Sequence, residues 1–180
     1  MKIKKAKFKD AYIIEPEAFK DARGWFAETY RKSELKKIGF SGNFVQDNHS
    51  KSVSRGTLRG LHLQKAPFAQ AKLIRCIRGS VLDVIVDLRK KSKTYKKWQK
   101  IELSEKNMKQ ILIPHGFAHG YLTLEKNSEI EYKVDNYYDK KSERSIRYND
   151  PELKIDWETK NPVISDKDKN APYLKESDLI

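Results

Sequence analysis

Cysteine is scarce in this chain: Cys76 is the one cysteine among 180 residues. A single cysteine cannot form an internal disulfide, and such usage is typical of a reducing compartment such as the cytoplasm. Because Cys76 lies in the apolar run of residues 73–77 (LIRCI), we interpret it as a buried, inert thiol rather than a nucleophile.

Long apolar runs are also missing. No run approaches the roughly 20 apolar residues that a membrane-spanning helix needs. Residues 1–10 are rich in lysine, but no apolar segment follows them, so we predict no signal peptide. We therefore expect a cytoplasmic protein without a membrane partner.

Acidic side chains are outnumbered: 25 Asp and Glu stand against 38 Lys and Arg, which gives a net charge of +13. A basic surface attracts anions, including phosphate-bearing metabolites and nucleic acids. The lysines are spread along the chain, and the densest basic run, residues 89–93 (RKKSK), is typical of a solvated turn. We therefore do not expect nucleic acid as a partner.

Alternation with period 2 takes the place of long helical periodicity. Residues 81–88 (VLDVIVDL) carry leucine or valine at every even position, so these side chains would share one strand face. Further predicted strands are residues 7–16, 26–30, 57–64, 72–77, 98–103, 110–113, 120–124 and 130–134. One short helix is predicted, with Ser33 as its N-cap and Gly39 at its end.

These short strands are separated by turn residues, and the chain contains no linker, repeat or low-complexity stretch. The tail from Asp150 is irregular and contains three prolines. The pattern predicts a single all-β domain over residues 1–180, a sandwich or barrel of the jelly-roll kind.

Two of the four histidines stand in informative surroundings. His62 lies in residues 58–64 (LRGLHLQ), where alternation would place Leu58, Gly60, His62 and Gln64 on one face. A glycine beside an inward histidine would leave room for a ligand to approach the backbone. His119 lies in residues 114–120 (PHGFAHG), a turn that leads into a strand.

The spacing Pro114-x-Gly116-x-x-His119 resembles the second motif of the cupin superfamily. An ordered set of further segments resembles the dTDP-4-dehydrorhamnose 3,5-epimerase family. These are residues 21–28 (DARGWFAE), 46–50 (QDNHS), 58–62 (LRGLH), 67–73 (PFAQAKL), 83–87 (DVIVD), 114–120, Tyr132, 137–138 (YY), 149–151 (NDP) and 165–168 (SDKD). The set spans residues 21–168, nearly the whole chain.

The resemblance implies a cupin-type double-stranded β-helix, a homodimer that exchanges an N-terminal strand, and no metal or other cofactor. The residues also disfavour a metal. Metal-binding cupins usually place two histidines one residue apart, whereas this chain has His62-Leu63-Gln64, and glutamine is a poor ligand for a transition metal.

The reaction implied by the resemblance inverts C3 and C5 of dTDP-4-keto-6-deoxy-D-glucose to give dTDP-4-keto-L-rhamnose. Inversion beside a ketone needs a base, a group that stabilises the enolate, and an acid on the opposite face of the sugar. His62 is the candidate base, because an imidazole titrates near neutral pH. The resemblance places its carboxylate partner on Asp168, with Asp166 as the competing assignment.

Tyr132 is the candidate acid, and the alternative is a core tyrosine with a satisfied hydroxyl. Lys72 is the candidate stabiliser of the enolate oxygen, and the alternative is an ordinary surface lysine. We expect His119 and Asp83 to form a supporting polar pair, because a carboxylate that alternates with buried valine and isoleucine needs a partner.

The substrate carries two phosphates, which suit the planar fork of arginine. Arg23 and Arg59 stand at matching family positions, although Arg23 could instead form a salt bridge within its own turn. Tyr138 would stack on the thymine base. The other expected substrate-binding residues are Glu28, Gln46, Asn48, His119, Glu143 and Lys167.

Three other functions stay open at this level. The chain could be a related 3- or 5-epimerase or a ketoisomerase, or it could be a cupin that binds a sugar without catalysis. A basic β-barrel that binds nucleic acid would need aromatic and basic side chains interleaved on one exposed face, and the aromatic residues here fall mostly in buried alternation or in the motifs above.

Overall fold

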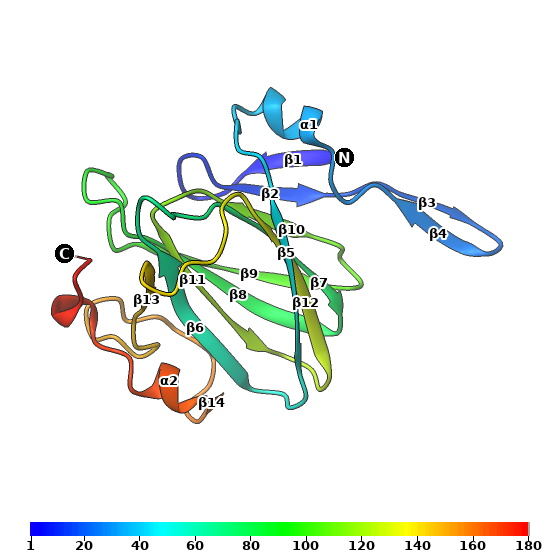
Figure 1. The fold of residues 1–180 in the computed structure, drawn as a ribbon. Coiled ribbons are helices and arrows are strands. Elements are labelled where there is room, and N and C mark those ends of the chain that lie inside the picture. Colours follow the sequence, from blue (N-terminus) through cyan, green and yellow to red (C-terminus); the bar gives the residue numbers. More distant parts are fainter. Residues whose placement is uncertain (180) are drawn as a thin grey trace.

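The computed structural model describes residues 1–179, and its regular structure is mostly β-strand (Figure 1). One sheet has six strands in the order β1-β2-β10-β7-β12-β5. Their bounds are Lys2–Lys5 (β1), Tyr12–Glu15 (β2), Gln46–Ser52 (β5), Lys72–Arg78 (β7), Gln110–Ile113 (β10) and Ser128–Val134 (β12). All neighbouring strands in this sheet are antiparallel.

The second sheet has the order β13-β6-β11-β8-β9, and a short strand, β14, lies parallel to β6. The bounds are Thr57–Gln64 (β6), Ser80–Asp87 (β8), Trp98–Ser104 (β9), Phe117–Thr123 (β11), Glu143–Ser145 (β13) and Val163–Ile164 (β14). The helices are short: Lys32–Lys37 (α1), Asp166–Lys169 (α2) and the 3-10 turn Leu174–Glu176.

A separate hairpin of Ala18–Asp21 (β3) and Gly24–Ala27 (β4) extends away from both sheets (Figure 1). The two large sheets face each other, and their inner faces form one apolar cluster with side chains from β7 to β12. The all-β architecture predicted from the alternation is thereby confirmed.

Strand β8 shows how the alternation produces these layers. Leu82, Val84 and Val86 pack outward against the C-terminal segment, including Trp157. The opposite face of the strand points between the sheets, where Ile85 joins the interior cluster. The other sheet is covered on its outer face by α1 and the loops around it.

Two predicted strands differ from the structure, and one long strand of the structure was not predicted. Residues 7–16 form a hairpin turn and one short strand rather than a single strand, and Asp10 has a left-handed backbone (φ 68°) in that turn. Residues 26–30 overlap only the end of β4. Strand β5 was not predicted, because its inward side chains are polar and give no apolar alternation.

The predicted helix exists, but its N-cap is Arg31 rather than Ser33, and Ser33 lies in the first turn. The end was predicted correctly. Gly39 follows the C-cap Ile38 and has φ +86°, a conformation that glycine adopts without steric cost.

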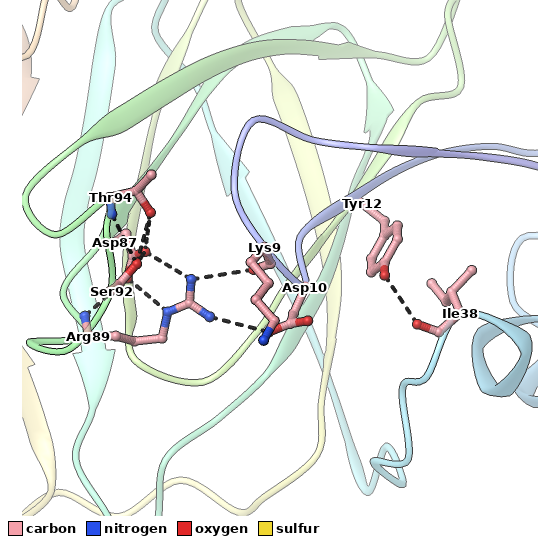
Figure 2. Close-up of polar contacts among 8 residues, drawn as sticks. All are labelled: Lys9, Asp10, Tyr12, Ile38, Asp87, Arg89, Ser92 and Thr94. Atoms are coloured by element: carbon pink, nitrogen blue, oxygen red, sulfur yellow. Dashed lines mark hydrogen bonds and ion pairs between the residues drawn. The ribbon is translucent and has the colours of Figure 1, made fainter.

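The basic run at residues 89–93 is anchored, not merely a solvated turn (Figure 2). Arg89 donates to both carboxylate oxygens of the fully buried Asp87 at 2.9 Å and also reaches the carbonyl of Lys9. Ser92 and Thr94 donate to the same carboxylate. Burial would raise the pKa of Asp87, but these donors lower it to about 2. This network fixes the β8–β9 turn against the turn between β1 and β2.

Cys76 is buried, as predicted, and burial raises the pKa of its thiol to about 11. Within residues 1–179, no helix has the length and apolar character needed to cross a membrane.

Candidate active site

Both sheets line a cavity of about 580 Å³ that gathers many of the predicted site residues. The predicted residues along it are Arg59, His62, Lys72, His119, Tyr132, Lys167 and Asp168. A second cavity of about 290 Å³ shares His62, Lys72 and Tyr132 with the first. It adds Gln46, Asn48, Tyr138 and Glu143.

A bulge in β6 sets the direction of His62. His119 of β11 pairs with His62 of β6, and Tyr121 of β11 pairs with Arg59 of β6. The two partners are two residues apart in β11 but three residues apart in β6. The extra residue in β6 puts Arg59 beside His62 at the cavity, while Leu58 packs in the outer cluster with the neighbouring leucines. Leu58 also borders this cavity, but simple alternation does not persist through the bulge, because Arg59, which alternation would place on the opposite face, lines the same cavity as His62.

Gly60 serves the packing of the strands instead of giving a ligand access. A Cβ at Gly60 would lie 2.6 Å from the Cα of Gly120, and the backbone of Gly60 has φ +124°. The close contact between β6 and β11 requires glycine at this point. The backbone N–H of Gly60 donates to the Asp168 carboxylate at 3.1 Å.

The carboxylate that contacts His62 belongs to Asp168, not to Asp166. Nε2 of His62 lies 2.6 Å from Oδ1 of Asp168, whose side chain is buried. Ser165 caps α2 by accepting from the N–H of Asp168, which orients the helix and its carboxylate toward β6. Burial would raise the pKa of Asp168, but the bond and charge of His62, together with the N–H of Gly60 and the charge of Lys167, outweigh it and lower the pKa.

Lys72 begins β7 and points into the region shared by the two cavities. Burial lowers the pKa of its ammonium to about 8, although the carboxylates of Asp83 and Glu143 act in the opposite direction. A lysine held in this state supplies a positive charge at neutral pH that is poorly solvated and available to a developing anion.

His119 and Asp83 form the expected pair, with 2.7 Å between Nε2 and Oδ2. Both side chains are buried, and burial lowers the pKa of His119 despite its carboxylate neighbour. The other Asp83 oxygen has no hydrogen-bond partner within residues 1–179. The charge of Asp83 also acts on Lys72, whose pKa it raises against the effect of burial.

Tyr132 stands on β12, with its ring centroid 5.8 Å from Nζ of Lys72. Burial raises the pKa of its hydroxyl, so the group keeps its proton at neutral pH. In the part of the chain that the structure describes, that hydroxyl makes no hydrogen bond, which differs from a satisfied core tyrosine.

The smaller cavity is bordered by a polar network. The Tyr138 hydroxyl donates to Glu143 at 3.1 Å, and the Lys167 ammonium donates to the other oxygen of Glu143 at 2.7 Å. Burial would raise the pKa of Glu143, but Lys167, Tyr138 and His62 together outweigh it, so the pKa is lowered. The Gln46 amide donates to Asn48 at 2.9 Å. The Tyr138 ring is exposed, so one of its faces can receive a planar group.

The family model for dTDP-4-dehydrorhamnose 3,5-epimerase matches residues 5–176. A protein of that name from Shigella flexneri is 45% identical over 100% of this chain and 99% of its own. A crystal structure of such an epimerase from Bacillus anthracis, with TDP and diphosphate bound, has TM-score 0.94 and 47% identity over 96% of this chain and 99% of the other. A crystal structure of a dTDP-6-deoxy-D-glucose-3,5-epimerase from Legionella pneumophila, in complex with dTDP-4-keto-L-rhamnose, has TM-score 0.93 and 40% identity over 98% of this chain and 94% of the other.

The chain belongs to the dTDP-4-dehydrorhamnose 3,5-epimerase family. It is an isomerase of the class that epimerises carbohydrates, and its two-sheet architecture is the cupin-type fold of this family. The resemblance deduced from the ordered motifs is thereby confirmed.

Two of the expected substrate-binding residues of this epimerase do not line the cavities of their own chain. Arg23 pairs with Asp21 at 2.5 Å in the β3–β4 turn, and its side chain is 90% exposed. Glu28 pairs with Arg31 at 2.5 Å beside the start of α1. The turn salt bridge named as the alternative for Arg23 is what the structure shows.

Sequence reasoning missed two hydroxyl groups in the epimerase cavity. Tyr121 is buried, and its hydroxyl lies 2.9 Å from the Ser50 hydroxyl. Ser50 lies on β5, the strand that alternation did not reveal, while Tyr121 is two residues after His119 on β11. The period of two within β11 was the signal available for Tyr121.

Arg59 is held at the rim by Ser52 and by the carbonyl of Lys51, at 3.2 and 3.1 Å. Among residues 1–179, no three His, Cys, Asp or Glu side chains gather in a way that could hold a metal ion. His62 and His119 each face a carboxylate instead.

Proposed function

We propose that this epimerase inverts C3 and C5 of dTDP-4-keto-6-deoxy-D-glucose to give dTDP-4-keto-L-rhamnose, a step of dTDP-L-rhamnose biosynthesis, in a single domain without a cofactor. The observation that carries the proposal is the presence of the His62–Asp168 pair, Lys72 and Tyr132 on one cavity. The Legionella relative, which binds the proposed product, supports the choice of substrate.

In the proposed first step, His62 takes the proton from a carbon beside the C4 ketone. The C–H electron pair forms a C=C bond, and the C4 oxygen becomes an enolate. Asp168 holds the imidazole in place at 2.6 Å and stabilises the imidazolium that forms.

Lys72 stabilises the enolate by its positive charge. Its ammonium is poorly solvated, so its attraction for a nearby oxyanion is stronger than that of a surface lysine. The His119–Asp83 pair provides the buried polar surroundings of this charge.

Tyr132 donates a proton to the carbon from the other face of the ring, which leaves that centre inverted. Its raised pKa keeps the hydroxyl protonated until the carbanion-like carbon accepts the proton. The imidazolium then loses its proton to solvent and the tyrosinate regains one, which restores the site. The same sequence at the second carbon completes the double inversion.

The carrier occupies the smaller cavity and the rim in this proposal. Tyr138 stacks on thymine, with Gln46, Asn48, Glu143 and Lys167 as its polar neighbours. Arg59 binds a phosphate at the rim of the larger cavity.

We also propose a homodimer in which the β3–β4 hairpin reaches the partner. This hairpin exposes Phe19, Trp25 and Phe26, which are 58%, 59% and 67% exposed. Apolar side chains concentrated on a projecting hairpin are typical of an interface. Such an arrangement would bring Arg23 and Glu28 to the cavity of the other subunit.

The function is tested by proton NMR of the substrate in deuterated water with the purified protein. Deuterium at both C3 and C5, with formation of the L-rhamno sugar, is expected. Exchange at one carbon would instead indicate a mono-epimerase, and binding without exchange would indicate a non-catalytic cupin. Activity should survive exhaustive dialysis against a chelator, and recovery only with added metal would contradict the cofactor-free mechanism.

A further inference from the structure

Gln64 lies at the end of β6, two residues after His62. Its side-chain amide is buried, and both its nitrogen and its oxygen form hydrogen bonds. Its Nε2 donates to the carbonyl of Phe68 at 2.7 Å and to the carbonyl of Tyr137 at 3.1 Å. Its Oε1 accepts from the N–H of Asp139 at 2.7 Å. Gln64 is 6% exposed, so its amide is largely shielded from water.

These three bonds join two loops that are far apart in the sequence. One is the β6–β7 loop, residues 65–71, and the other is the β12–β13 loop, residues 135–142. Additional bonds run between the same loops: Gln70 donates to the carbonyl of Asn136 at 2.8 Å, and Asn136 donates to that of Pro67 at 3.2 Å. Gln64 differs from both because it is buried and contacts both loops.

The backbone around Tyr138 is where the bonds converge. Gln64 accepts the N–H that follows Tyr138 and donates to the carbonyl that precedes it. Gln46 accepts the N–H of Tyr138 itself at 3.2 Å. Glutamine side chains thus fix the backbone on both sides of Tyr138, while its ring is 54% exposed and faces the smaller cavity.

A primary amide is the side-chain group that can make this set of contacts without a charge. It donates twice and accepts at its oxygen, whereas a carboxylate accepts only and an apolar side chain does neither. Replacing Gln64 with a side chain of similar shape that lacks the amide would leave these three backbone groups without their protein partner, a loss that a flexible loop relieves by moving.

We propose that Gln64 is a positioning residue for the nucleotide end of the substrate. It acts through Tyr138 by holding the β12–β13 loop so that the exposed ring is presented to the base before the ligand arrives. Preorganisation of this kind lowers the entropic cost of binding. The inference rests on the proposed function, because it takes the ligand of the smaller cavity to be a thymidine diphosphate.

The test compares Gln64→Met with wild type in the full chain, using thymidine diphosphate in calorimetry and the dTDP-keto-sugar in steady-state kinetics. We expect Kd and KM to rise about tenfold while kcat stays within about threefold, since the chemistry lies on other residues. Gln64→Glu keeps the shape and the acceptor but loses both donors, so it should weaken binding at least as much. It serves as the second variant if Gln64→Met does not fold.

The matched control is Asn107→Leu. Asn107 also makes three bonds to backbone groups, with Ser104, Lys109 and Glu102, but it lies in the β9–β10 turn and lines neither cavity. It should lower the melting temperature without changing Kd or KM. A shift in Kd equal to that of Gln64→Met would show that the effect is only a general loss of stability, and would overturn the proposal.

A double-mutant cycle with Tyr138→Ala tests the route of the effect. If Gln64 acts through Tyr138, Gln64→Met should change Kd by no more than about twofold in the Tyr138→Ala background. Full additivity, or an unchanged Kd in a folded Gln64 variant, would overturn the positioning role while leaving the epimerase function intact. Failure of wild type to bind thymidine diphosphate would instead overturn both.

Discussion

At the scale of single residues, burial shifts the pKa values of two groups in one cavity in opposite directions. Burial lowers the pKa of Lys72 to about 8 and raises that of Tyr132. Lys72 remains mostly protonated at neutral pH despite this lowering, because its pKa still lies above 7, and the raised pKa of Tyr132 keeps its hydroxyl protonated. This is the combination that the proposed enolate mechanism requires.

The first prediction separates base from acid. His62→Ala should abolish both turnover and deuterium exchange, because no group remains to remove the α-proton. Tyr132→Phe should lose about 10²–10⁴-fold in turnover while the α-proton still exchanges on the face it left. The two rates are measured by proton NMR in deuterated water.

The control for Tyr132→Phe is its stability. The replaced hydroxyl makes no hydrogen bond within the described residues, so thermal unfolding should change little. A large drop in melting temperature with near-normal specific activity would identify Tyr132 as a structural residue and leave the mechanism without its acid.

The second prediction concerns the pH dependence conferred by Lys72. Its charge is present below about pH 8 and is lost as the pH rises through that value, so kcat/KM should fall above about pH 8. Lys72→Arg keeps a charge at all these pH values, so its residual activity should lack this descending limb. The measurement is kcat/KM from pH 6 to 10, and an identical limb in Lys72→Arg would assign it to another group.

At the scale of elements, one short helix holds His62, the proposed catalytic base. The carboxylate of Asp168 in α2 bonds both to His62 and to the N–H of Gly60, so it ties the C-terminal segment to β6. The bulge in the same strand turns Arg59 toward the cavity. The geometry of the proposed catalytic pair therefore depends on the contact between β6 and α2.

The third prediction follows from the lowered pKa of Asp168. A carboxyl with a lowered pKa in the folded state stabilises that state above its unfolded pKa of about 3.9, and this contribution is lost as the pH falls through the folded pKa. Asp168→Asn should therefore reduce the free energy of unfolding by about 1–3 kcal/mol at pH 7. The difference from wild type should shrink below about pH 4.

The measurement is urea unfolding at pH 7, 5 and 3.5. Asp166→Asn is the matched control, because Asp166 lies in the same helix but is exposed and is not the residue that contacts His62. Its effect should stay within about 0.5 kcal/mol. Equal losses for both variants would mean that the helix as a whole, and not the His62 contact, provides the stability.

At the scale of the whole molecule, the β3–β4 hairpin projects from the two large sheets and belongs to neither of them (Figure 1). Its aromatic side chains are exposed although most other large apolar residues are packed. Arg23 at its tip and Glu28 just beyond it lie outside the cavities of their own chain. A second copy that receives the hairpin would bury its aromatic side chains. It would also place Arg23 and Glu28 at the cavity of that copy.

The fourth prediction tests that arrangement. Wild type should elute with the mass of two chains in light scattering coupled to size exclusion, and a Trp25→Ser, Phe26→Ser double variant should shift toward one chain. KM should rise in the same variant, since Arg23 and Glu28 would no longer reach the partner. A monomeric wild type with full activity would contradict the homodimer.

The sequence by itself determined the architecture and most of the residue types of the site. Alternation of apolar side chains in residues 81–88 was enough to predict a buried strand, because successive side chains of a strand point to opposite faces. The ordered motifs identified His62, Lys72 and Tyr132, which the fold brings to one cavity.

Only the tertiary structure decided which groups meet. Side-chain periodicity does not encode a register shift, so it could not show the bulge that turns Arg59 toward His62. It could not choose Asp168 over Asp166, because that contact joins residues 106 positions apart. Nor could it show that Gln64 holds two loops, because backbone groups give no sign in the sequence of which side chain they will bind.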